Sequence, residues 1–424
     1  MRLEGRTVVV GLTGGIACYK ACEVVRLLVG AGARAPVIMS AGAQQFVTPL
    51  TLQTLSGQAV ATDTFSLTQE SEIGHIRLAD QADAIVIAPA TANALGKLAN
   101  GIADDLLTTV LLAARAPLVL APAMNVHMWE HAAVQENLAR LLGRGARIIG
   151  PTSGALACGY EGTGRLAEPA DIVEEVCCAL TAQDLRGERV LVSAGPTREP
   201  IDPVRYLSNH SSGKMGYAVA RVARRRGAEV TLVAGPTALT PPPGVRVVPV
   251  GTAREMAAAV EEAFPGATVV IMTAAVADYR PRERYPRKLK KDAAGLALEL
   301  DRNPDILAGL GARKGGRLLV GFAAETGDVA AEARRKLAAK HLDLIVANDV
   351  TAPGAGFGGD TNAVRLLDAG GLDDALPVLD KEEVAARVLD WVAAHRRRAG
   401  TATLRPVPGR AAPRRSPRSS GRGA

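Results

Sequence analysis

Small hydrogen-bonding residues gather in one short segment, YLSNHSSGKMG, at residues 206–216. A phosphate-binding P-loop would need a glycine five residues before the Gly-Lys pair and a serine or threonine directly after it. The chain has Ser208 and Met215 at these two positions, so the segment is not a P-loop. Because a helical pattern starts here, the segment still predicts a site for a polar ligand at a helix N-terminus.

Four further loops carry groups that can bind a ligand, and each follows an apolar run typical of a buried strand. They are GLTGGIA (11–17), APATAN (88–93), APAMNVHMW (121–129) and ACGYEGTGRLAEP (157–169). The first is not GxGxxG, but its backbone N–H groups suit a monophosphate. The third supplies Asn125, and the fourth has the glycine spacing of a flexible flap that carries Cys158. Ligands of α/β sheets bind at the carboxyl ends of the strands, so chemistry is expected at these loops.

Isolated histidine and cysteine side chains have structural explanations as well. A lone histidine such as His75 is more often structural than catalytic, and burial explains a single thiol such as Cys158 equally well. Cys18 and Cys22 are four residues apart on one predicted helix, where packing explains them. The five cysteines form no CxxC pair and lack paired histidines, so neither disulfides nor a zinc site are expected.

Strands and helices alternate along the chain in two successive blocks. The first block has predicted strands at 7–12, 83–91, 117–125 and 146–154. The pattern restarts at Gly187, with a helix at 215–227 and predicted strands at 188–197, 228–235, 267–277, 317–325 and 342–350. This alternation predicts two doubly wound parallel-sheet α/β domains, at 1–186 and 187–395.

Composition narrows the remaining possibilities. Hydrophobic residues make up 48% and charged residues 22%, which is typical of a soluble globular protein, and the apolar runs are shorter than the about 20 residues of a membrane span. Met1 leads directly into a charged residue and a strand, so no signal peptide and a cytoplasmic location are expected. Residues 396–424 contain nine arginines and no acids and are predicted to form a disordered tail. Such a tail can contact nucleic acid by counterion release, but it is more often simply solvated, so no specific nucleic acid partner is predicted.

The loops of residues 5–180 together resemble those of the flavin-dependent cysteine decarboxylases, specifically phosphopantothenoylcysteine decarboxylase. The motifs that carry the resemblance are GLTGGIA, GHIRLA, APATAN, PAMNVHMW and ACGYEGTGR. The resemblance implies a flavodoxin-like domain that binds FMN, with His75 as an active-site base, Asn125 as a ligand of the substrate carboxylate and Cys158 as the acid that completes the reaction. The residues that it implies for FMN are Gly11, Thr13, Gly14, Gly15, Ser40, Ala88, Pro89, Ala90 and Thr91.

These residue types fit the chemistry of that family. A cysteinyl carboxylate does not lose CO₂ readily, because the resulting carbanion has no electron sink. FMN would oxidise the thiol to a thioaldehyde that acts as the sink, and the enethiol left after decarboxylation would be protonated and reduced by the same flavin. The protein would supply orientation and proton donors.

Residues 188–392 resemble phosphopantothenate–cysteine ligase. The motifs concerned are SAGPTREPIDPVRYLSNHSSGKMG, TAAVADYRP, KLKK, NPDIL, GFAAET and KLAAKHLDLIVAND. The resemblance implies that CTP activates the carboxylate of 4'-phosphopantothenate as an acyl-cytidylate, which the nitrogen of cysteine then attacks. Asn209 would hold the acyl-cytidylate, Lys288 would stabilise charge during the transfer, and Asp278 would bind the nucleotide or Mg²⁺. The residues implied to line the CTP site are Ala274, Asp278, Lys288, Pro304, Asp305, Ile306, Leu307, Phe322, Lys336 and Lys340.

The ligase residues also have ordinary explanations when each is taken alone. The basic run that contains Lys288 is typical of a solvated loop. Lys336 and Lys340 lie four residues apart on a predicted helix that also carries Glu332, where surface ion pairs are common.

The two halves in one chain resemble the bacterial bifunctional enzymes of coenzyme A biosynthesis, which implies ligation followed by decarboxylation. In that family the decarboxylase domains trimerise around an FMN site shared between subunits and the ligase domains dimerise, so a homo-oligomer, a dodecamer, is expected. Two alternatives stay open. A flavin decarboxylase acting on the C-terminal cysteine of a peptide would lack the second half, and a regulatory or binding protein on the same fold would lack Cys158 or His75.

Overall fold

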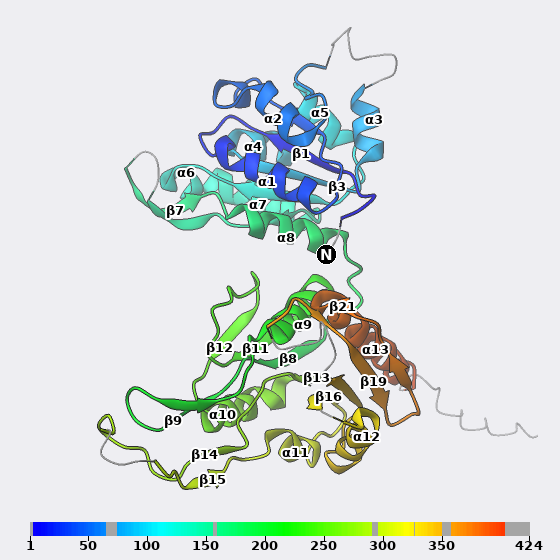
Figure 1. Cartoon of the computed structure of the whole chain (residues 1–424). Helices are drawn as coiled ribbons and strands as arrows, with labels where there is room; N and C mark the ends of the chain where they lie inside the picture. Colours follow the sequence, from blue (N-terminus) through cyan, green and yellow to red (C-terminus); the bar gives the residue numbers. More distant parts are fainter. Residues whose placement is uncertain are drawn as a thin grey trace, which may run out of the picture.

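The computed structural model describes residues 3–64, 74–155, 159–290, 296–325, 327–349 and 358–402. These residues form two α/β domains that follow one another along the chain (Figure 1). Among the described residues, none of the helices combines the length and hydrophobicity of a membrane span.

The first domain is built on a parallel sheet whose described strands run in the order β2-β1-β3-β4-β5. The strands are β1 (Val8–Leu12), β2 (Val37–Met39), β3 (Ala84–Ala90), β4 (Leu118–Pro122) and β5 (Arg147–Ile148). This is the flavodoxin-like order, which reverses direction between β1 and β3 and leaves a crevice at their carboxyl ends. The predicted parallel sheet is therefore confirmed.

Alternating side chains of the strands feed two hydrophobic cores, one on each face of this sheet. Val8 and Val10 of β1 pack in the core under α1 (Cys18–Gly30), α2 (Pro49–Ser56) and α8 (Pro169–Leu180). Val9 packs in the opposite core, which α3 (Gly74–Gln81), α4 (Ala92–Asn100), α5 (Leu106–Ala113) and α7 (Ala132–Gly143) cover.

The strand predicted at 146–154 is two separate elements. Its first part is β5, at the edge of the sheet, and its second part is β6 (Thr152–Ala155). β6 pairs antiparallel with β7 (Glu161–Arg165) in a hairpin that leaves the sheet and lies against α6 (Val126–Glu130). Gly150 and Pro151 separate the two strands, and because proline lacks a backbone donor, the sheet pairing does not continue through it.

The second domain has a larger sheet, whose described strands run in the order β12-β11-β8-β13-β16-β17-β19-β20. The strands up to β17 are parallel: β8 (Arg189–Ala194), β11 (Glu229–Ala234), β12 (Arg246–Pro249), β13 (Val269–Met272), β16 (Leu318–Glu325) and β17 (Leu344–Asp349). The predicted parallel sheet is confirmed, with an antiparallel edge that was not predicted, formed by β19 (Val364–Asp368) and β20 (Asp373–Ala375). The short segment between β19 and β20 allows only a hairpin, since a parallel crossover needs a dozen or more residues.

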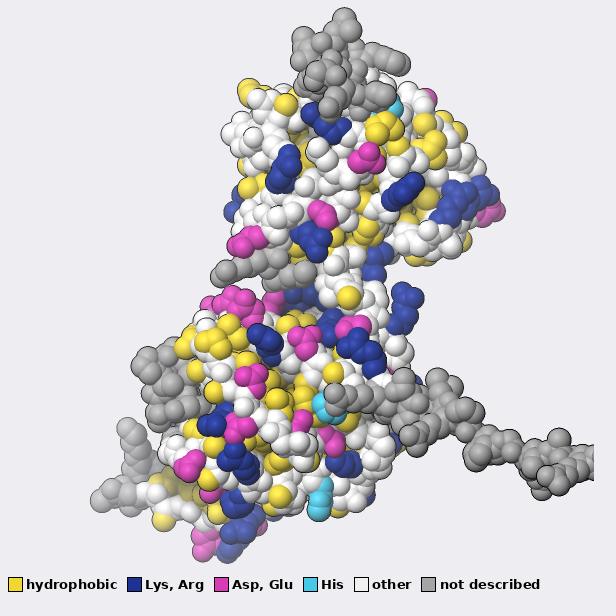
Figure 2. Space-filling view, turned by 90° about the vertical axis from the view of Figure 1, so that its right-hand side faces the viewer, with side chains coloured by type: hydrophobic (Ala, Val, Ile, Leu, Met, Phe, Trp, Pro, Cys, Tyr) yellow, Lys and Arg dark blue, Asp and Glu magenta, His cyan; other side chains and the backbone are white. Residues whose placement is uncertain are grey.

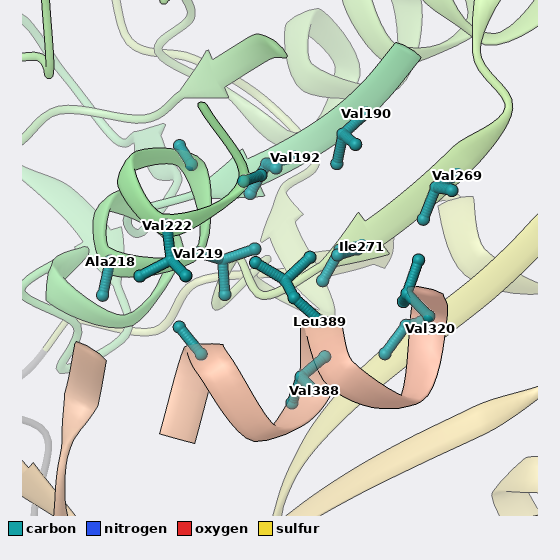
Figure 3. Close-up of a cluster of buried hydrophobic side chains, with 14 of the residues drawn as sticks. Val190, Val192, Ala218, Val219, Val222, Val269, Ile271, Val320, Val388 and Leu389 are labelled. Carbon is teal, nitrogen blue, oxygen red and sulfur yellow. The ribbon is translucent and has the colours of Figure 1, made fainter. Parts of the chain in front are cut away.

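Helices cover both faces of the second sheet. α9 (Lys214–Arg225) and α13 (Lys381–Ala402) share one core with Val190 and Val192 of β8 and Val269 and Ile271 of β13 (Figure 3). The other face packs against α10 (Ala253–Ala263), α11 (Ile306–Gly311) and α12 (Val329–Ala339). Short antiparallel pairs extend from the domain: β9 (Arg198–Pro200) with β10 (Tyr206–Ser208), β14 (Tyr279–Pro281) with β15 (Leu300–Arg302), and β18 (Thr361–Asn362) with β21 (Leu379–Asp380).

Charged side chains join the two domains. The Arg225 guanidinium of α9 donates Nε and Nη2 to the two carboxylate oxygens of Glu174 on α8, both at 2.6 Å, and both side chains are at most 10% exposed. Arg224 pairs with Glu175 at 2.6 Å. Figure 2 shows Lys, Arg, Asp and Glu side chains gathered around this junction.

The tail predicted from residue 396 does not begin there. α13 continues to Ala402, and Arg396 donates to Glu188 at 2.9 Å. The predicted boundary therefore lies within α13, because the arginines at this point still contact acids of the domain. Residues 403–424 lie outside the described residues.

Candidate functional site

A cavity of about 750 Å³ opens at the carboxyl edge of the first sheet. Its walls come from the segments after β1, β2, β3 and β4 and from the β6–β7 hairpin. The predicted FMN residues that line it are Thr13, Gly14, Gly15, Ser40 and Thr91. Ligand sites of this volume and position are common in α/β folds.

Two threonines connect the turns after β1 and β3. The hydroxyl of Thr13 donates to the carbonyl of Pro89 at 2.6 Å and accepts from the N–H of Thr91 at 3.0 Å. The hydroxyl of Thr91 accepts from the N–H of Ala94 at 3.3 Å and caps α4. These bonds hold the N-terminus of α4 at the cavity, where its free N–H groups favour an anion.

Two glycines bring the turns after β1 and β2 together. A Cβ atom added to Gly14 would lie 3.0 Å from the Cα of Gly42, and one added to Gly42 would lie 3.1 Å from the Cα of Gly14. A side chain at either position would therefore crowd the facing backbone, and both glycines line the cavity. Ser40 begins the second turn, with its hydroxyl accepting from the N–H of Ala43 at 3.3 Å.

The remaining predicted FMN residues lie within strands and do not line this cavity. Gly11 is in β1, where a Cβ atom would lie 2.5 Å from the Cδ1 of Ile87, so packing between strands and α5 explains the glycine. Ala88, Pro89 and Ala90 are buried in β3. Of these, Pro89 contributes through the carbonyl that fixes Thr13.

Asn125 lies at the cavity, at the N-terminus of α6. Its Oδ1 accepts from the N–H of His127 at 2.8 Å, which caps the helix. The β6–β7 hairpin closes onto this segment, because the N–H of Met124 donates to the carbonyl of Gly164 at 2.9 Å. A Cβ atom on Gly164 would lie 2.2 Å from the carbonyl oxygen of Met124, so only glycine permits this approach.

The structure does not bring all predicted decarboxylase residues together. His75 is in the first turn of α3 and does not line the cavity, and its buried Nδ1 has no hydrogen-bond partner among the described residues. Cys158 lies outside the described residues. Sequence reasoning missed Lys20 and Arg165, which both line the cavity and share Glu168, at 3.2 Å and 3.0 Å.

A second cavity, of about 600 Å³, opens where β8 and β13 reverse the strand order of the second sheet. It is lined by every predicted ligase residue except Lys288. These residues are Asn209, Ala274, Asp278, Pro304, Asp305, Ile306, Leu307, Phe322, Lys336 and Lys340. They come from five separate segments of the chain, so the fold brings together residues that are far apart in the sequence.

The segment singled out at 206–216 forms one wall of this cavity. Gly213, at the N-cap of α9, has a φ of +77°, a backbone conformation that side-chain-bearing residues rarely adopt. A Cβ atom on Gly216 would lie 2.5 Å from both the Cβ of Ala194 and the Oγ1 of Thr273. The two glycines let α9 start close against β8 and β13, with its N-terminus facing the cavity.

Amide side chains fix the opposite wall. The Nδ2 of Asn209 donates to the carbonyls of Ala275 and Val276 at 3.2 Å and 3.1 Å. The Nδ2 of Asn303 donates to the carbonyl of Ala277 at 2.8 Å, and the N–H of Asn303 donates to the carbonyl of Asp278 at 2.8 Å. The carbonyls after β13 are thereby satisfied, which holds this loop in one conformation.

Two predicted lysines line the cavity, and each is paired with a carboxylate. Lys336 pairs with Glu325 at 2.6 Å, and Lys340 pairs with Asp305 at 2.9 Å. Burial alone would raise the pKa of Asp305, but the hydrogen bonds from Lys340 and the N–H of Ala308 hold it below its usual value. The carboxylate of Asp305 therefore stays charged and keeps Lys340 in place.

Two lysines at the other end of the cavity were not predicted. Lys214 donates to Asp360 at 2.7 Å, and Lys381 is buried and donates to the carbonyl of Gly359. Burial lowers the pKa of Lys381, and the charge of Lys214 lowers it further. No sequence motif marks Lys381, since α13 brings it to the cavity from almost 170 residues away along the chain.

Lys288 lies apart from the cavity, exposed, on the loop after β14. Within the described residues, His, Cys, Asp and Glu side chains do not form a group of three or more that could bind a metal ion. Asp278, the predicted metal ligand, is an exposed carboxylate at the cavity.

Comparison with known proteins agrees with this arrangement. Residues 1–181 match the family model described as Flavoprotein, and residues 185–395 match that of the DNA/pantothenate metabolism flavoprotein C-terminal domain. Together, the two folds and their cavities define a two-domain flavoprotein enzyme.

Relatives of nearly full length place the chain more closely. The coenzyme A biosynthesis bifunctional protein CoaBC of Bacillus subtilis (strain 168) is 51% identical over 402 residues, 94% of this chain and 99% of that protein. The protein with the same description in Escherichia coli (strain K12) is 47% identical, over 92% of this chain and 98% of its own. The solved C-terminal domain of a CoaBC protein is 46% identical and covers 50% of this chain and 98% of that chain, with a TM-score of 0.44.

The chain belongs to the CoaBC family of bifunctional coenzyme A biosynthesis proteins. It is a phosphopantothenoylcysteine decarboxylase and a phosphopantothenate–cysteine ligase. The predicted family and pair of activities are confirmed.

Proposed function

We propose that the first domain binds FMN in the cavity at the carboxyl edge of its sheet and converts 4'-phosphopantothenoylcysteine to 4'-phosphopantetheine. The cavity fits such a cofactor, because Gly14 and Gly42 present backbone without side chains at its wall, and the N-terminus of α4 adds backbone N–H donors. When bound, FMN supplies the oxidation of the substrate thiol and the later return of the two electrons.

The chain's own residues bind the substrate and handle protons. Asn125, at the N-terminus of α6, would bind the carboxylate that leaves as CO₂, and the α6 N–H groups favour the same charge. Cys158 would donate the proton that completes the reaction. The β6–β7 hairpin covers the cavity beside Asn125 and limits the access of water.

We propose that His75 acts in a cavity of a neighbouring subunit. His75 does not line the cavity of its own chain, and large apolar side chains are exposed on the first domain: Ile16 and Tyr19 at the cavity, and Phe46 and Leu50 near α2. Exposed apolar surface of this kind favours self-association, in line with the predicted trimer and dodecamer. Mixed oligomers of His75→Asn and Cys158→Ser chains test this proposal, since a shared site regains decarboxylation that each variant alone lacks. If the mixed oligomers do not recover decarboxylation, the proposal of a shared site is contradicted.

We propose that the second domain uses CTP and Mg²⁺ to activate 4'-phosphopantothenate before cysteine attacks the acyl-cytidylate. The observation that carries the proposal is that all predicted ligase residues except Lys288 line one cavity. Lys336 and Lys340 would offset the charge that develops on the departing pyrophosphate. Asp278 would hold Mg²⁺ together with nucleotide phosphates, as Mg²⁺ is usually bound by one or two carboxylates and substrate oxygens.

The variant Lys340→Met tests the nucleotide site. Removal of this charge should raise the KM for CTP by roughly 10- to 100-fold, because a charge-assisted hydrogen bond is worth about 1.5 to 3 kcal/mol. Release of CMP and pyrophosphate is the measurement. Lys314→Met is the matched control, since Lys314 pairs with Asp343 and does not line the cavity. An unchanged KM for CTP in Lys340→Met would contradict the assignment.

The cytoplasmic location of the protein stays a prediction.

A further inference from the structure

The loop that carries Lys288 is attached to one turn between β9 and β10. The N–H of Leu289 donates to the Oδ2 of Asp202 at 3.2 Å, and the Nη2 of Arg205 donates to the carbonyl of Leu289 at 3.0 Å. The N–H of Tyr285 donates to the carbonyl of Ile201 at 2.9 Å. Both backbone polar groups of the residue that follows Lys288 are therefore held by the same turn.

Asp202 is the centre of this attachment, and its side chain is fully buried. Its Oδ1 accepts from the N–H groups of Val204 and Arg205, both at 2.8 Å. Its Oδ2 accepts from the Nε and Nη2 of Arg205, at 2.9 Å and 2.6 Å, in addition to Leu289. Burial alone would raise the pKa of Asp202, but the hydrogen bonds from Arg205 and from backbone N–H groups hold it well below its usual value. A carboxylate bonded on both oxygens is a rigid anchor.

The same turn leads directly to the ligase cavity. β10 follows it, pairs with β9 through Tyr206 opposite Pro200, and ends one residue before Asn209. β9 also lies beside β14 (Figure 1), which continues from Asp278 at the cavity toward the loop of Lys288. One buried carboxylate therefore connects the loop of Lys288 to a wall of the cavity.

We propose that Asp202 is a positioning residue for Lys288: it fixes the backbone at Leu289, and Arg205 completes the attachment. The inference rests on the proposed ligase function, in which Lys288 stabilises charge during cytidylyl transfer. Lys288 is exposed and its side chain has several rotatable bonds. The position of its ammonium group therefore depends on how firmly the backbone of the loop is held. Asp202 does not line the cavity, and the family resemblance implies no role for it.

An ordinary structural role would explain part of the same geometry, since the Asp202–Arg205 pair also stabilises the turn. The two roles differ in how substitutions combine. If Asp202 acts through Lys288, its loss should have no further effect once Lys288 has been replaced, because residues that act as one unit are not additive. If Asp202 instead has a separate structural effect, the fold losses of kcat from the two substitutions should multiply in the double variant.

The experiment compares Asp202→Asn, Lys288→Gln and the double variant in the full chain. Initial rates of pyrophosphate release are measured against CTP concentration. We expect Lys288→Gln to lower kcat on the order of 100-fold, and Asp202→Asn to lower kcat about 10- to 100-fold with an unchanged KM for CTP. The double variant should match Lys288→Gln alone. Decarboxylation of added phosphopantothenoylcysteine should stay unchanged in all variants and reports that the other domain is intact.

Asp301→Asn is the matched control, because it makes the same change on β15, where Asp301 pairs with Arg280 and Arg282 at the β14 end of the loop, and it leaves the two bonds at Leu289 in place. It should leave pyrophosphate release unchanged. If Asp202→Asn does not fold, Arg205→Lys keeps the charge, removes the bond to Leu289 and should lower kcat in the same non-additive way.

Three results would overturn the inference. An unchanged kcat in Asp202→Asn, or a loss that multiplies with that of Lys288→Gln, would contradict positioning while leaving the ligase assignment in place. Full activity of Lys288→Gln would instead remove the proposed role of Lys288, and the positioning role with it.

Discussion

Thr13 shows how a single hydroxyl shapes the cofactor cavity. It is buried and connects the turns after β1 and β3 through the carbonyl of Pro89 and the N–H of Thr91. Thr13→Val has almost the same shape but leaves both backbone groups without this partner, which costs about 1 to 3 kcal/mol. We expect weaker FMN retention and a lower melting temperature, measured by flavin release during gel filtration and by calorimetry. Thr51→Val, at an exposed position on α2, is the control. Equal FMN retention in both variants would contradict this role.

Residue types at strand ends were predictable from the sequence, but their orientation was not. Thr13, Ser40 and Thr91 follow apolar runs, and position alone brings them to the carboxyl edge of the sheet. Gly11 belongs to the same motif, yet it serves packing against Ile87. Motif membership does not separate Gly14, which lines the cavity, from Gly11, because both positions are crowded by neighbouring atoms and favour a residue without a side chain.

At the scale of elements, α9 couples the ligase cavity to the sheet. Gly216→Ala would place a Cβ atom 2.5 Å from Ala194 and Thr273, and such overpacking costs about 1 to 3 kcal/mol. We expect α9 to shift away from β8. Ligase activity should be lost and the melting temperature of the second domain should fall, while decarboxylation continues. Gly309→Ala on α11 is the matched control, because a Cβ atom there meets nothing within 4 Å. A Gly216→Ala variant as active and stable as this control would show that α9 tolerates the displacement.

The elements themselves were largely predictable, with failures at edges. The apolar runs of β1, β3, β8 and β13 are buried on both sides and therefore produce an unambiguous pattern. For the β6–β7 hairpin, β6 was predicted as the end of one long strand and β7 as part of a flap, because these glycine-rich segments lack an apolar pattern. The antiparallel edge at β19 was missed, since strand direction depends on connection length and not on residue pattern.

At the scale of the whole molecule, buried ion pairs hold the domains together. Arg225 bonds to Glu174 on α8 and also to Glu382 on α13, at 2.8 Å. Arg225→Met would leave the buried carboxylate of Glu174 and the partly buried carboxylate of Glu382 without this partner, and breaking a buried pair costs about 3 to 5 kcal/mol. We expect one joint thermal transition to separate into two, measured by calorimetry. Arg335→Met, which removes an exposed pair with Glu332, should change stability by less than about 1 kcal/mol. A single unshifted transition in Arg225→Met would contradict the role of this pair.

The pair of Arg225 with Glu382, which lies within the second domain, also defines a pH dependence. Burial alone would raise the pKa of Glu382, but Arg225 and further hydrogen bonds lower it from 4.5 to about 2. A lowered pKa stabilises the folded state above the unfolded pKa, and this contribution is lost as the pH falls from 4.5 toward 2. Urea unfolding at successive pH values should therefore show a steeper loss of stability in this window for the wild type than for Glu382→Gln. Parallel curves would contradict the assignment.

This junction was not foreseen from the sequence. The run Arg224–Arg226 ends a predicted helix, where basic residues are usual, and its acidic partners on α8 are some 50 residues earlier along the chain. Nothing local distinguishes a buried arginine from a solvated one, so only the packing of α8 against α9 reveals the ion pairs.

The most direct test of the account is mass spectrometry of one reaction with the full chain. The purified protein would receive 4'-phosphopantothenate, cysteine and Mg²⁺, with either CTP or ATP. We predict that CTP yields CMP, pyrophosphate and 4'-phosphopantetheine, and that ATP does not. Accumulation of undecarboxylated phosphopantothenoylcysteine would contradict the function of the first domain. Absence of the cysteinyl adduct and of 4'-phosphopantetheine with either nucleotide would contradict the whole account.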